Sequence, residues 1–556
     1  MNFQDPILAG FHAHCDRDPD QPAIEIIGEG GSSIYHNRRE LRALIRDTAA
    51  RFQSQGITPG DKVLIKLSHG DALLRTLLGC FELGAIPCLL PWRFAHAGSP
   101  GDLKRLDLQA TSIEAEWLIT TPAIKESWLS IERNWRVELR TFAEATAKNH
   151  DTVADFKPAQ GEATAYLQFT SGTTGAGRTA ELSAQAIQHC LHRDATKLDL
   201  GTKDRVLNWL PLYHDLGLFA GLLLPLLSGA RIIWMSPVRF LRRPAEFLDT
   251  IDRKSITVTF ATNAALHQLA GLPETDTRPD LSSLKRFICG GEPIRHESLR
   301  RFEDLFKTQQ FDPASWVIGY GMAETVVGVI ATDPRTGQTP RTDWVESHAL
   351  KTNNQAVACE PDKATAIPIV TCGQPWHRDE LKIIDENGTD LAERVVGEVC
   401  LRGPFLFSGY YRQPEETAKV MRDGWLYTGD LGYLADGHLY ICGRRKDLII
   451  VGGTNIHPEE IEAAAQTVSG LSPGRLVAFG APNDQTGTEG IIVVMEIARQ
   501  ETLSIPSLEA AVRQRITEQV GLAPQRILSM PRGWIIKTSS GKLSRHKCRT
   551  KYLNHE

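Results

Sequence analysis

Residues 166–183 read YLQFTSGTTGAGRTAELS, an apolar run followed by a loop of glycines and hydroxyl side chains. The apolar run predicts a buried strand. Glycines let the loop backbone bend where a side chain would forbid it, so that N–H groups can approach an anion closely. The hydroxyls add side-chain donors. The pattern predicts a phosphate-binding loop with the ligands Thr170, Ser171, Gly172, Thr173, Thr174 and Gly175.

Two other interpretations of this loop stay open at this point. Gly172, Gly177, Arg178 and Thr179 match the spacing of a P-loop, except that arginine stands where the P-loop has lysine. Arginine differs from lysine in shape and hydration, so the exchange is not conservative. The second alternative is a polar turn without a ligand, which a Thr-Ser-Gly-Thr-Thr-Gly string directly after an apolar strand disfavours.

The composition is that of an ordinary soluble globular protein, because 42% of the 556 residues are hydrophobic and 23% are charged. This length is enough for roughly three to four average domains. The formal net charge of −5 argues against a dedicated nucleic-acid-binding protein. A basic cluster near the C-terminus, from Lys542 to Lys551, fits a solvated tail.

Cysteine spacing and hydropathy bear on the cellular compartment. The ten cysteines form no Cys-x-x-Cys pair, which fits reduced thiols rather than a disulfide framework or a zinc site. The first twenty residues are too polar and acidic for a signal peptide. The longest apolar stretch, residues 216–227, contains Pro225 and is too short to span a membrane, so we expect a buried helix there. We therefore predict a cytoplasmic protein without an integral membrane segment.

The order of the expected elements predicts an α/β fold. Helical spacing over residues 37–53 and 71–83 alternates with strand patterns over 62–67 and 84–90. Such alternation predicts a mainly parallel sheet with helices on its faces. Further strands are expected within residues 23–27, 257–262, 284–292, 316–325, 381–385 and 397–402.

Two of these strands end in glycine turns that carry polar residues. Residues 284–292 read LKRFICGGE and residues 316–325 read WVIGYGMAET, which places Glu324 just after a turn. Ligands of open α/β sheets bind beyond the carboxyl ends of the strands, so both turns can border one crevice. Plainer interpretations are that Tyr320 only packs and that Glu324 only begins a helix, where the dipole favours a carboxylate. His214, in the string PLYHDLGL, fits a pocket wall and a structural role equally well.

The last part of the chain predicts a small β unit and then a separate domain. Residues 335–370 are polar and poorly periodic, which suggests an inserted excursion. Beyond it, Asp436-Gly437 is typical of a tight hairpin turn. A charged break at residues 443–447 precedes a compact α+β segment of ordinary domain size. Near its end Lys542 follows Ser-Ser-Gly, which either presents the ammonium to an anion or leaves it at the surface.

Seven strings in this order resemble the adenylate-forming superfamily of acyl-CoA synthetases, peptide-synthetase adenylation domains and luciferases: TSGTTG, PLYHDLGL, GGEP, GYGMAE, GWLYTGD, GRRKDLIIVGGTNIHPEEIE and KTSSGK. The resemblance extends over nearly the whole chain and removes the P-loop alternative. It implies an α/β fold whose large N-terminal domain, residues 1–443, has parallel-type sheets with helices plus a small β unit. A hinge at 444–446 would join this domain to a small, mobile α+β C-terminal domain, residues 447–556.

The resemblance also implies a role for each matching residue. The ATP phosphates would lie in the loop that begins at Thr170, and Glu324 would hold Mg²⁺. Lys446 stands at the hinge position, Lys542 matches the lysine that reaches into the adenylation site, and His214 would lie on the acyl side. Tyr320 would stack on the base, and the ribose hydroxyls would bind a carboxylate. The implied adenine and ribose ligands are Gly291, Glu292, Pro293, Tyr320, Gly321, Asp430 and Arg444.

The implied reaction is the activation of a carboxylic acid. The substrate carboxylate attacks the α-phosphorus of ATP, and pyrophosphate leaves. Charge grows on the phosphoryl oxygens, so catalysis consists mainly of positioning and electrostatic stabilisation. Mg²⁺ and Lys542 would supply the positive charge, and no nucleophilic side chain is required.

Within the superfamily the chain looks most like fatty acyl-AMP ligases, which pass an activated fatty acid to the phosphopantetheine of a carrier protein. Ala323 in YGMAE, the segment 335–370 and the ending KTSSGKLSR favour this branch. Gly452-Gly453 resembles acyl-CoA synthetases instead, and Arg178 replaces the loop lysine of the family. Transfer to CoA and a non-catalytic acyl-adenylate-binding homologue therefore stay as alternatives. We expect a separate holo-acyl carrier protein as the partner.

Overall fold

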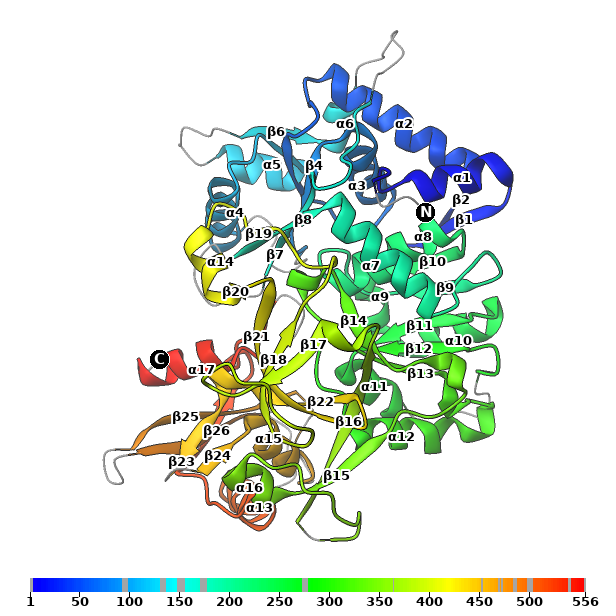
Figure 1. Ribbon diagram of the computed structural model, residues 1–556. Coiled ribbons are helices and arrows are strands. Elements are labelled where there is room, and N and C mark those ends of the chain that lie inside the picture. The colour runs from blue at the N-terminus through cyan, green and yellow to red at the C-terminus, as the bar shows by residue number, and fades with distance from the viewer. Residues whose placement is uncertain are drawn as a thin grey trace.

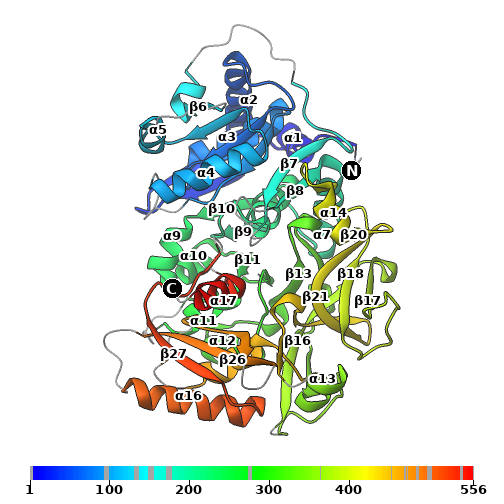
Figure 2. The ribbon, with the colours of Figure 1, turned by 90° about the vertical axis from the view of Figure 1, so that its left-hand side faces the viewer.

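The structure is a computed structural model of the chain. It describes residues 4–92, 99–130, 137–147, 156–170, 178–272, 279–363, 365–451, 454–468, 471, 474–483, 488–497, 504–538 and 542–554. These residues form a large N-terminal domain and a smaller C-terminal domain, which lies at the lower end of the molecule in both ribbon views (Figure 1 and Figure 2). The expected mixed α/β fold is confirmed.

A parallel sheet of four described strands lies at the opposite end of the large domain (Figure 1). Its order is β4 (Ile86–Leu89), β3 (Lys62–Lys66), β5 (Trp117–Thr120) and β6 (Glu138–Thr141). The helices of this region are α2 (Arg38–Ser54), α3 (Asp71–Leu83), α4 (Pro100–Ser112), α5 (Pro122–Leu129) and α6 (Phe142–Ala145). Helix α2 begins where the sequence predicts, because Asn37 and Glu40 form a reciprocal capping box.

The second sheet runs through the middle of the large domain and is parallel in its first half. The order there is β1 (Pro22–Ile27), β10 (Arg231–Met235), β9 (Arg205–Asn208), β11 (Val258–Ala261), β12 (Arg286–Cys289) and β13 (Trp316–Gly321), with β2 (Ser33–Asn37) antiparallel at the edge. The nearby helices are α1 (Ala9–Arg17), α7 (Ala184–Lys197), α9 (Pro237–Arg242), α10 (Pro244–Lys254), α11 (Asn263–Ala270) and α12 (His296–Phe306). The strands predicted within 257–262, 284–292 and 316–325 are thus confirmed.

Beyond β13 the same sheet becomes antiparallel and forms the expected small β unit. Its order is β14 (Gly328–Ala331), β16 (Ala366–Pro375), β22 (His438–Arg444), β21 (Trp425–Ala435), β18 (Gly397–Leu401) and β17 (Leu381–Ile384), with β20 (Met421–Arg422) beside β21 and helix α14 (Pro414–Val420) before it. The predicted hairpin turn is present, since Asp436 and Gly437 have φ angles of 52° and 72°. Such angles favour short polar residues and glycine.

The strand before the predicted phosphate loop is β7 (Thr164–Phe169), and its partner across the loop is another strand. Strand β8 (Thr179–Ser183) pairs antiparallel with β7 and also with β19 (Gly409–Tyr410). A strand-to-helix turn, as in a P-loop, is therefore wrong for this segment. Residues 171–177, which include five of the six predicted phosphate ligands, lie outside the described residues.

Residues 216–227 form the buried helix that the sequence predicts, but with an unusual backbone. A π-helix, η1 (Leu216–Leu223), is continued by α8 (Leu224–Ser228). The buried Asn208 donates a 3.0 Å hydrogen bond to the Gly217 carbonyl of this wide turn, and a side chain at Gly221 would collide with Asn208. Helices of this kind are rare and often lie at functional sites. The described part of the chain holds no helix that is long and apolar enough to cross a membrane.

The polar segment 335–370 is more ordered than its composition suggests. It contains β15 (Thr342–Glu346), which pairs antiparallel with β16, and α13 (Ser347–Asn353). Val345 and Leu350 are buried in a small core that they share with the stacked rings of Tyr433 and Tyr440. The segment is thereby anchored on the β unit, while its status as an insertion stays a prediction.

The C-terminal domain packs a short sheet between helices. Its elements are β23 (Ile449–Val451), β24 (Thr454–Ile456), α15 (Pro458–Gln466), β25 (Leu476–Asn483), β26 (Thr488–Ile497), α16 (Ile505–Val520), β27 (Arg526–Pro531) and α17 (Arg545–Leu553). Alternate residues of β25 enter two separate cores, Ala478 facing α15 and α16 and Val477 facing the side of α17. The predicted α+β character of this region is confirmed; its exact boundary stays a prediction.

Lys351 and Arg295 of the large domain make polar contacts with described residues of the C-terminal domain. Lys351 of α13 pairs with Glu460 of α15 at 2.8 Å and donates to the carbonyl of Val520 at 3.2 Å. Arg295 donates to the Gln466 side chain at 2.8 Å. The Lys351 side chain is 5% exposed, so Glu460 and the carbonyl take the place of the water that its ammonium has lost.

The N-terminal sheet holds a buried ion pair whose disruption should destabilise the protein. Lys66 of β3 lies 3.0 Å from Asp102 of α4, and their side chains are 4% and 7% exposed. Asp102→Ala removes the carboxylate that lies 3.0 Å from this buried ammonium, and breaking a buried ion pair costs about 3–5 kcal/mol. Urea denaturation followed by far-UV circular dichroism measures the loss. The exposed Lys104 of the same helix is the control, since Lys104→Ala should change stability by about 0.5 kcal/mol or less; an equal effect of both variants would contradict the prediction.

Candidate active site

A cavity of about 2100 Å³ lies between the carboxyl ends of β12 and β13, the β unit and the C-terminal domain. Every predicted site residue that the structure describes lines this cavity. They are Thr170, His214, Gly291, Glu292, Pro293, Tyr320, Gly321, Glu324, Asp430, Arg444, Lys446 and Lys542. Residues from seven separate stretches of the chain are therefore brought together, as the glycine-ended strands predict.

The turn after β12 keeps one wall of the cavity free of side chains. A Cβ atom on Gly290 would lie 3.0 Å from the Gly319 carbonyl, and Gly291 has a φ of 81°, which side chains rarely adopt. The Glu292 carboxylate accepts a 2.7 Å hydrogen bond from the N–H of Ala264 in the first turn of α11. The Glu292 carboxylate thus interacts with the N-terminus of α11, and the turn presents mainly backbone atoms to the cavity.

Asp430 is the centre of a hydrogen-bonded group in the cavity wall. Its two carboxylate oxygens accept from the Tyr320 hydroxyl at 2.7 Å and from Arg444 Nε at 2.8 Å. Asp430 and Arg444 are cross-strand partners in β21 and β22, so the hairpin register fixes this pair. Burial and the Asp430 charge raise the pKa of Tyr320 well above its ordinary value. The phenol therefore stays a donor, and the remaining lone pairs of Asp430 can accept from a ligand.

Glu324 lies in the turn after β13, where two backbone segments pack closely against each other. A Cβ atom on Gly321 would lie 1.9 Å from the Val327 carbonyl, so only glycine fits there. Glu324 Oε1 accepts a 2.7 Å hydrogen bond from the hydroxyl of Tyr410, which comes from strand β19. Arg178 donates to the same hydroxyl at 3.3 Å and lies 5.1 Å above the ring. Arg178 thus stands one side chain away from Glu324.

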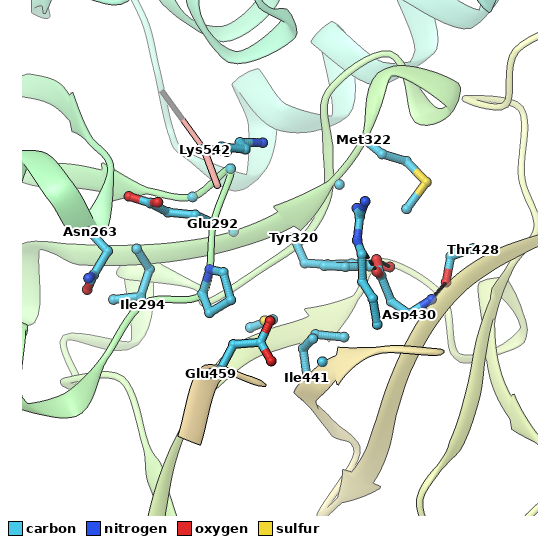
Figure 3. A pocket seen from close by; sticks show the side chains of 18 of the residues that line it. Asn263, Glu292, Ile294, Tyr320, Met322, Thr428, Asp430, Ile441, Glu459 and Lys542 are labelled. Carbon is cyan, nitrogen blue, oxygen red and sulfur yellow. Dashed lines mark hydrogen bonds and ion pairs between the residues drawn. The ribbon is translucent and has the colours of Figure 1, made fainter. Parts of the chain in front are cut away.

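Lys542 reaches from the C-terminal domain into the cavity, where Figure 3 shows it beside the turn that carries Glu292. A Cβ atom on Gly291 would lie 3.8 Å from its Nζ. The loop is braced by Thr538, whose N–H donates to the Lys542 carbonyl at 2.7 Å. Burial raises the pKa of Asp215, and the charge of Lys542 partly offsets that rise. Lys542 and His214, the neighbour of Asp215, therefore border the same part of the cavity.

The predicted hinge residue Lys446 lies in the short turn Arg445–Asp447 that leads from β22 to β23. Burial and the neighbouring Arg444 charge lower its pKa. Asp447 pairs at 3.4 Å with Arg545, which also pairs at 2.7 Å with both Glu459 and Glu462 of α15. This cluster ties the start of α17, three residues after Lys542, to the turn between the domains.

Several residues of the site were not singled out from the sequence, although Glu459 lies within the quoted string GRRKDLIIVGGTNIHPEEIE. Tyr410 and Glu459 line the cavity, and Arg545 holds the cluster beside it. Tyr410 lies 86 residues from its partner Glu324, a contact that only the tertiary fold reveals. Arg545 stands within the string KTSSGKLSR, so its proximity to Lys542 could have been noticed.

The fit of a divalent cation can be judged from the donor set. In the described part of the chain no three His, Cys, Asp or Glu side chains form a metal cage. Mg²⁺ in nucleotide sites is typically held by one or two carboxylates together with phosphate oxygens and water. The Glu324 carboxylate, with one oxygen oriented by Tyr410, fits that requirement.

This chain is similar to a family model and to curated relatives along most of its length. Residues 11–411 match the family model described as AMP-binding enzyme. A putative acyl-CoA synthetase of Caulobacter vibrioides is 29% identical over 542 residues, covering 95% of this chain and 93% of the relative. The medium-chain-fatty-acid–[acyl-carrier-protein] ligase JamA of Moorena producens is 30% identical over 555 residues, covering 93% and 89%.

A solved structure agrees in fold along the whole chain. It comes from structural and functional studies of fatty acyl-adenylate ligases from E. coli and L. pneumophila. The TM-score is 0.90 at 26% sequence identity, and the alignment covers 100% of this chain and 99% of the other. The likeness therefore includes the C-terminal domain.

Proposed function

The chain belongs to the AMP-binding enzyme family, and on that premise we propose that it activates a fatty acid with ATP and passes the acyl group to a carrier protein. The acid and ATP give acyl-AMP and pyrophosphate, and the phosphopantetheine thiol of a separate acyl carrier protein then displaces AMP. The observation that carries the proposal is the convergence of Lys542, Glu324 and the Asp430 group on one cavity.

The geometry supports a distinct role for each group. The base would lie against Tyr320 and the turn Gly291 to Pro293, and the ribose hydroxyls would donate to Asp430. The acid carboxylate forms a bond to the α-phosphorus while the bond to pyrophosphate breaks. Lys542 would place its ammonium where negative charge grows, and a charge held in position there stabilises the transition state. His214 would border the acyl side.

The phosphate end of the cavity would hold Mg²⁺ through Glu324, with the phosphates supplying the remaining oxygens. When bound, the ion neutralises charge on the phosphates. Tyr410 orients the carboxylate through its 2.7 Å hydrogen bond, and Arg178 adds a second positive charge nearby. Thr170 and the loop that follows would complete the phosphate site.

Acyl transfer would require a different arrangement of the domains. We assign residues 1–443 to the large domain, 444–446 to the hinge and 447–556 to the small domain, which would rotate about Lys446 to admit the thiol. The relative named as an acyl-carrier-protein ligase supports a carrier as acceptor, and the relative named as an acyl-CoA synthetase is the reason to keep CoA as the alternative.

The cellular location is proposed from the cysteines. The ten cysteines, all within the described part of the chain, form no disulfide, which fits a protein that acts in the reducing cytoplasm.

The decisive experiment is ATP–pyrophosphate exchange across a panel of carboxylic acids of increasing chain length. Exchange with fatty acids, and acyl-AMP that persists with CoA but is consumed by a holo-carrier protein, is the expected result. Mass spectrometry identifies the product in each case. Prompt formation of acyl-CoA would overturn the carrier assignment, and no exchange with any acid would favour a non-catalytic binder.

A further inference from the structure

Glu459 is a residue of the C-terminal domain whose side chain enters the nucleotide end of the cavity. It is the second residue of α15. Figure 3 shows its carboxylate directed toward the space bounded by Ile294, Tyr320 and Ile441. The two isoleucines and the ring offer no acceptor to a ligand at this place, so the Glu459 carboxylate is the polar group among them.

The two oxygens of this carboxylate have different surroundings. Oε1 pairs with Arg545 at 2.7 Å, which fixes the orientation of the side chain. Oε2 is buried, yet no donor in the described part of the chain reaches it. Room for the group exists because residue 443 is glycine: a Cβ atom there would lie 3.4 Å from Oε2 and 2.6 Å from His457 Nδ1. A buried carboxylate oxygen without a donor is costly, so a donor from a ligand is expected at Oε2.

The chemistry of the base selects that donor. Under the proposed function, on which this inference rests, the adenine lies against Tyr320. The exocyclic amine is the source of N–H donors on the adenine base, because its ring nitrogens are acceptors. A carboxylate that hydrogen-bonds to the base must therefore accept from the amine. We propose that Glu459 Oε2 accepts from the exocyclic amine of adenine and thereby selects ATP over nucleotides that lack it.

This assignment makes nucleotide recognition depend on the position of the C-terminal domain. Arg545 holds Glu459 and begins the helix that follows the Lys542 loop. The orientation that brings Lys542 to Gly291 thus also brings Glu459 to the base. Rotation of the domain would withdraw both groups together, so that AMP is held more weakly in the rotated arrangement.

The test compares AMP with purine riboside 5′-monophosphate, which differs only by the absence of the amine. Isothermal titration calorimetry on the full chain should give a preference for AMP of about ten- to a hundredfold, the range of a hydrogen bond to a charged group. In Glu459→Ala the affinity for AMP should fall to that of the analogue, while the affinity for the analogue stays unchanged. Pyrophosphate exchange with the two triphosphates should give the same ratios.

Glu518→Gln is the matched control, because Glu518 of α16 belongs to the same domain but is exposed and does not line the cavity. It should keep the preference for AMP. Equal losses for AMP and the analogue in Glu459→Ala would reveal a purely structural role through Arg545, and an unchanged preference would show that another group reads the amine. Either result overturns the inference. The wild-type exchange assay tests the proposed function separately, since calorimetry with AMP needs no acid substrate.

Discussion

Lys542→Ala is expected to lower the rate of acyl-adenylate formation by about 10²–10³-fold, the effect of removing one preorganised charge donor from a transition state. The ammonium approaches the Gly291 turn within the cavity, where it would meet the oxygens on which charge develops. Its loss should reduce kcat more than it raises the KM for ATP, because the ground state carries less of this charge. ATP–pyrophosphate exchange under saturating substrate measures the change.

The fold should survive this substitution. Lys542 is exposed to the cavity and its loop is held by backbone contacts with Thr538, so its side chain contributes little to packing. Circular dichroism and the thermal midpoint should match the wild type, as should AMP binding. Lys285→Ala, at an exposed position that does not line the cavity, controls for loss of a lysine charge. Undiminished exchange in Lys542→Ala would exclude the assigned role.

Local patterns were sufficient to predict the elements that border the site. Strands β12 and β13 are short apolar runs, and glycines follow or end them where the backbone must turn sharply. The Asp436-Gly437 turn likewise has positive φ angles that few residues tolerate. Such positions are dictated by backbone sterics, which a sequence reveals directly.

Features that depend on distant contacts could not be predicted. The wide turns of η1 are bridged by Asn208, which lies nine residues from its acceptor Gly217. The segment after the phosphate loop is strand β8, which pairs with β7 and also with β19, far along the chain. The Tyr410–Glu324 hydrogen bond and the entry of Glu459 into the cavity require the completed fold. Hydrophobic periodicity does not report such pairings.

The order of the seven strings along the chain carried information that no single string contains. No single string among the seven identifies a nucleotide site, yet each of the seven contributes described residues to one cavity. Their spacing along the chain is compatible with one arrangement of strands, so agreement in order carries geometric information that each short string lacks.

Asp430→Ala is expected to weaken the binding of AMP and ATP by roughly a hundredfold. Asp430 is 4% exposed and would accept hydrogen bonds from the ribose hydroxyls, and each bond to a charged group is worth about 1.5–3 kcal/mol. Its removal also frees Arg444 and the Tyr320 hydroxyl, which lose the carboxylate that orients them. The KM for ATP and the dissociation constant of AMP should rise together, and the KM for the acid should change little.

A series at the same site separates ribose binding from the support of Tyr320. Tyr320→Phe removes the hydroxyl that donates to Asp430 but keeps the ring, so it should weaken AMP binding by about tenfold or less. Asp430→Asn keeps the shape of the side chain but loses its charge. Its affinity for AMP should lie between the affinities of Asp430→Ala and Tyr320→Phe. Discrimination between AMP and 2′-deoxy-AMP is the sensitive readout, because it should decrease in both Asp430 variants and persist in Tyr320→Phe. If Asp430→Ala retained full discrimination against the deoxy nucleotide, the carboxylate would serve only to brace Tyr320 and Arg444, and the ribose would have to be bound by another group of the cavity.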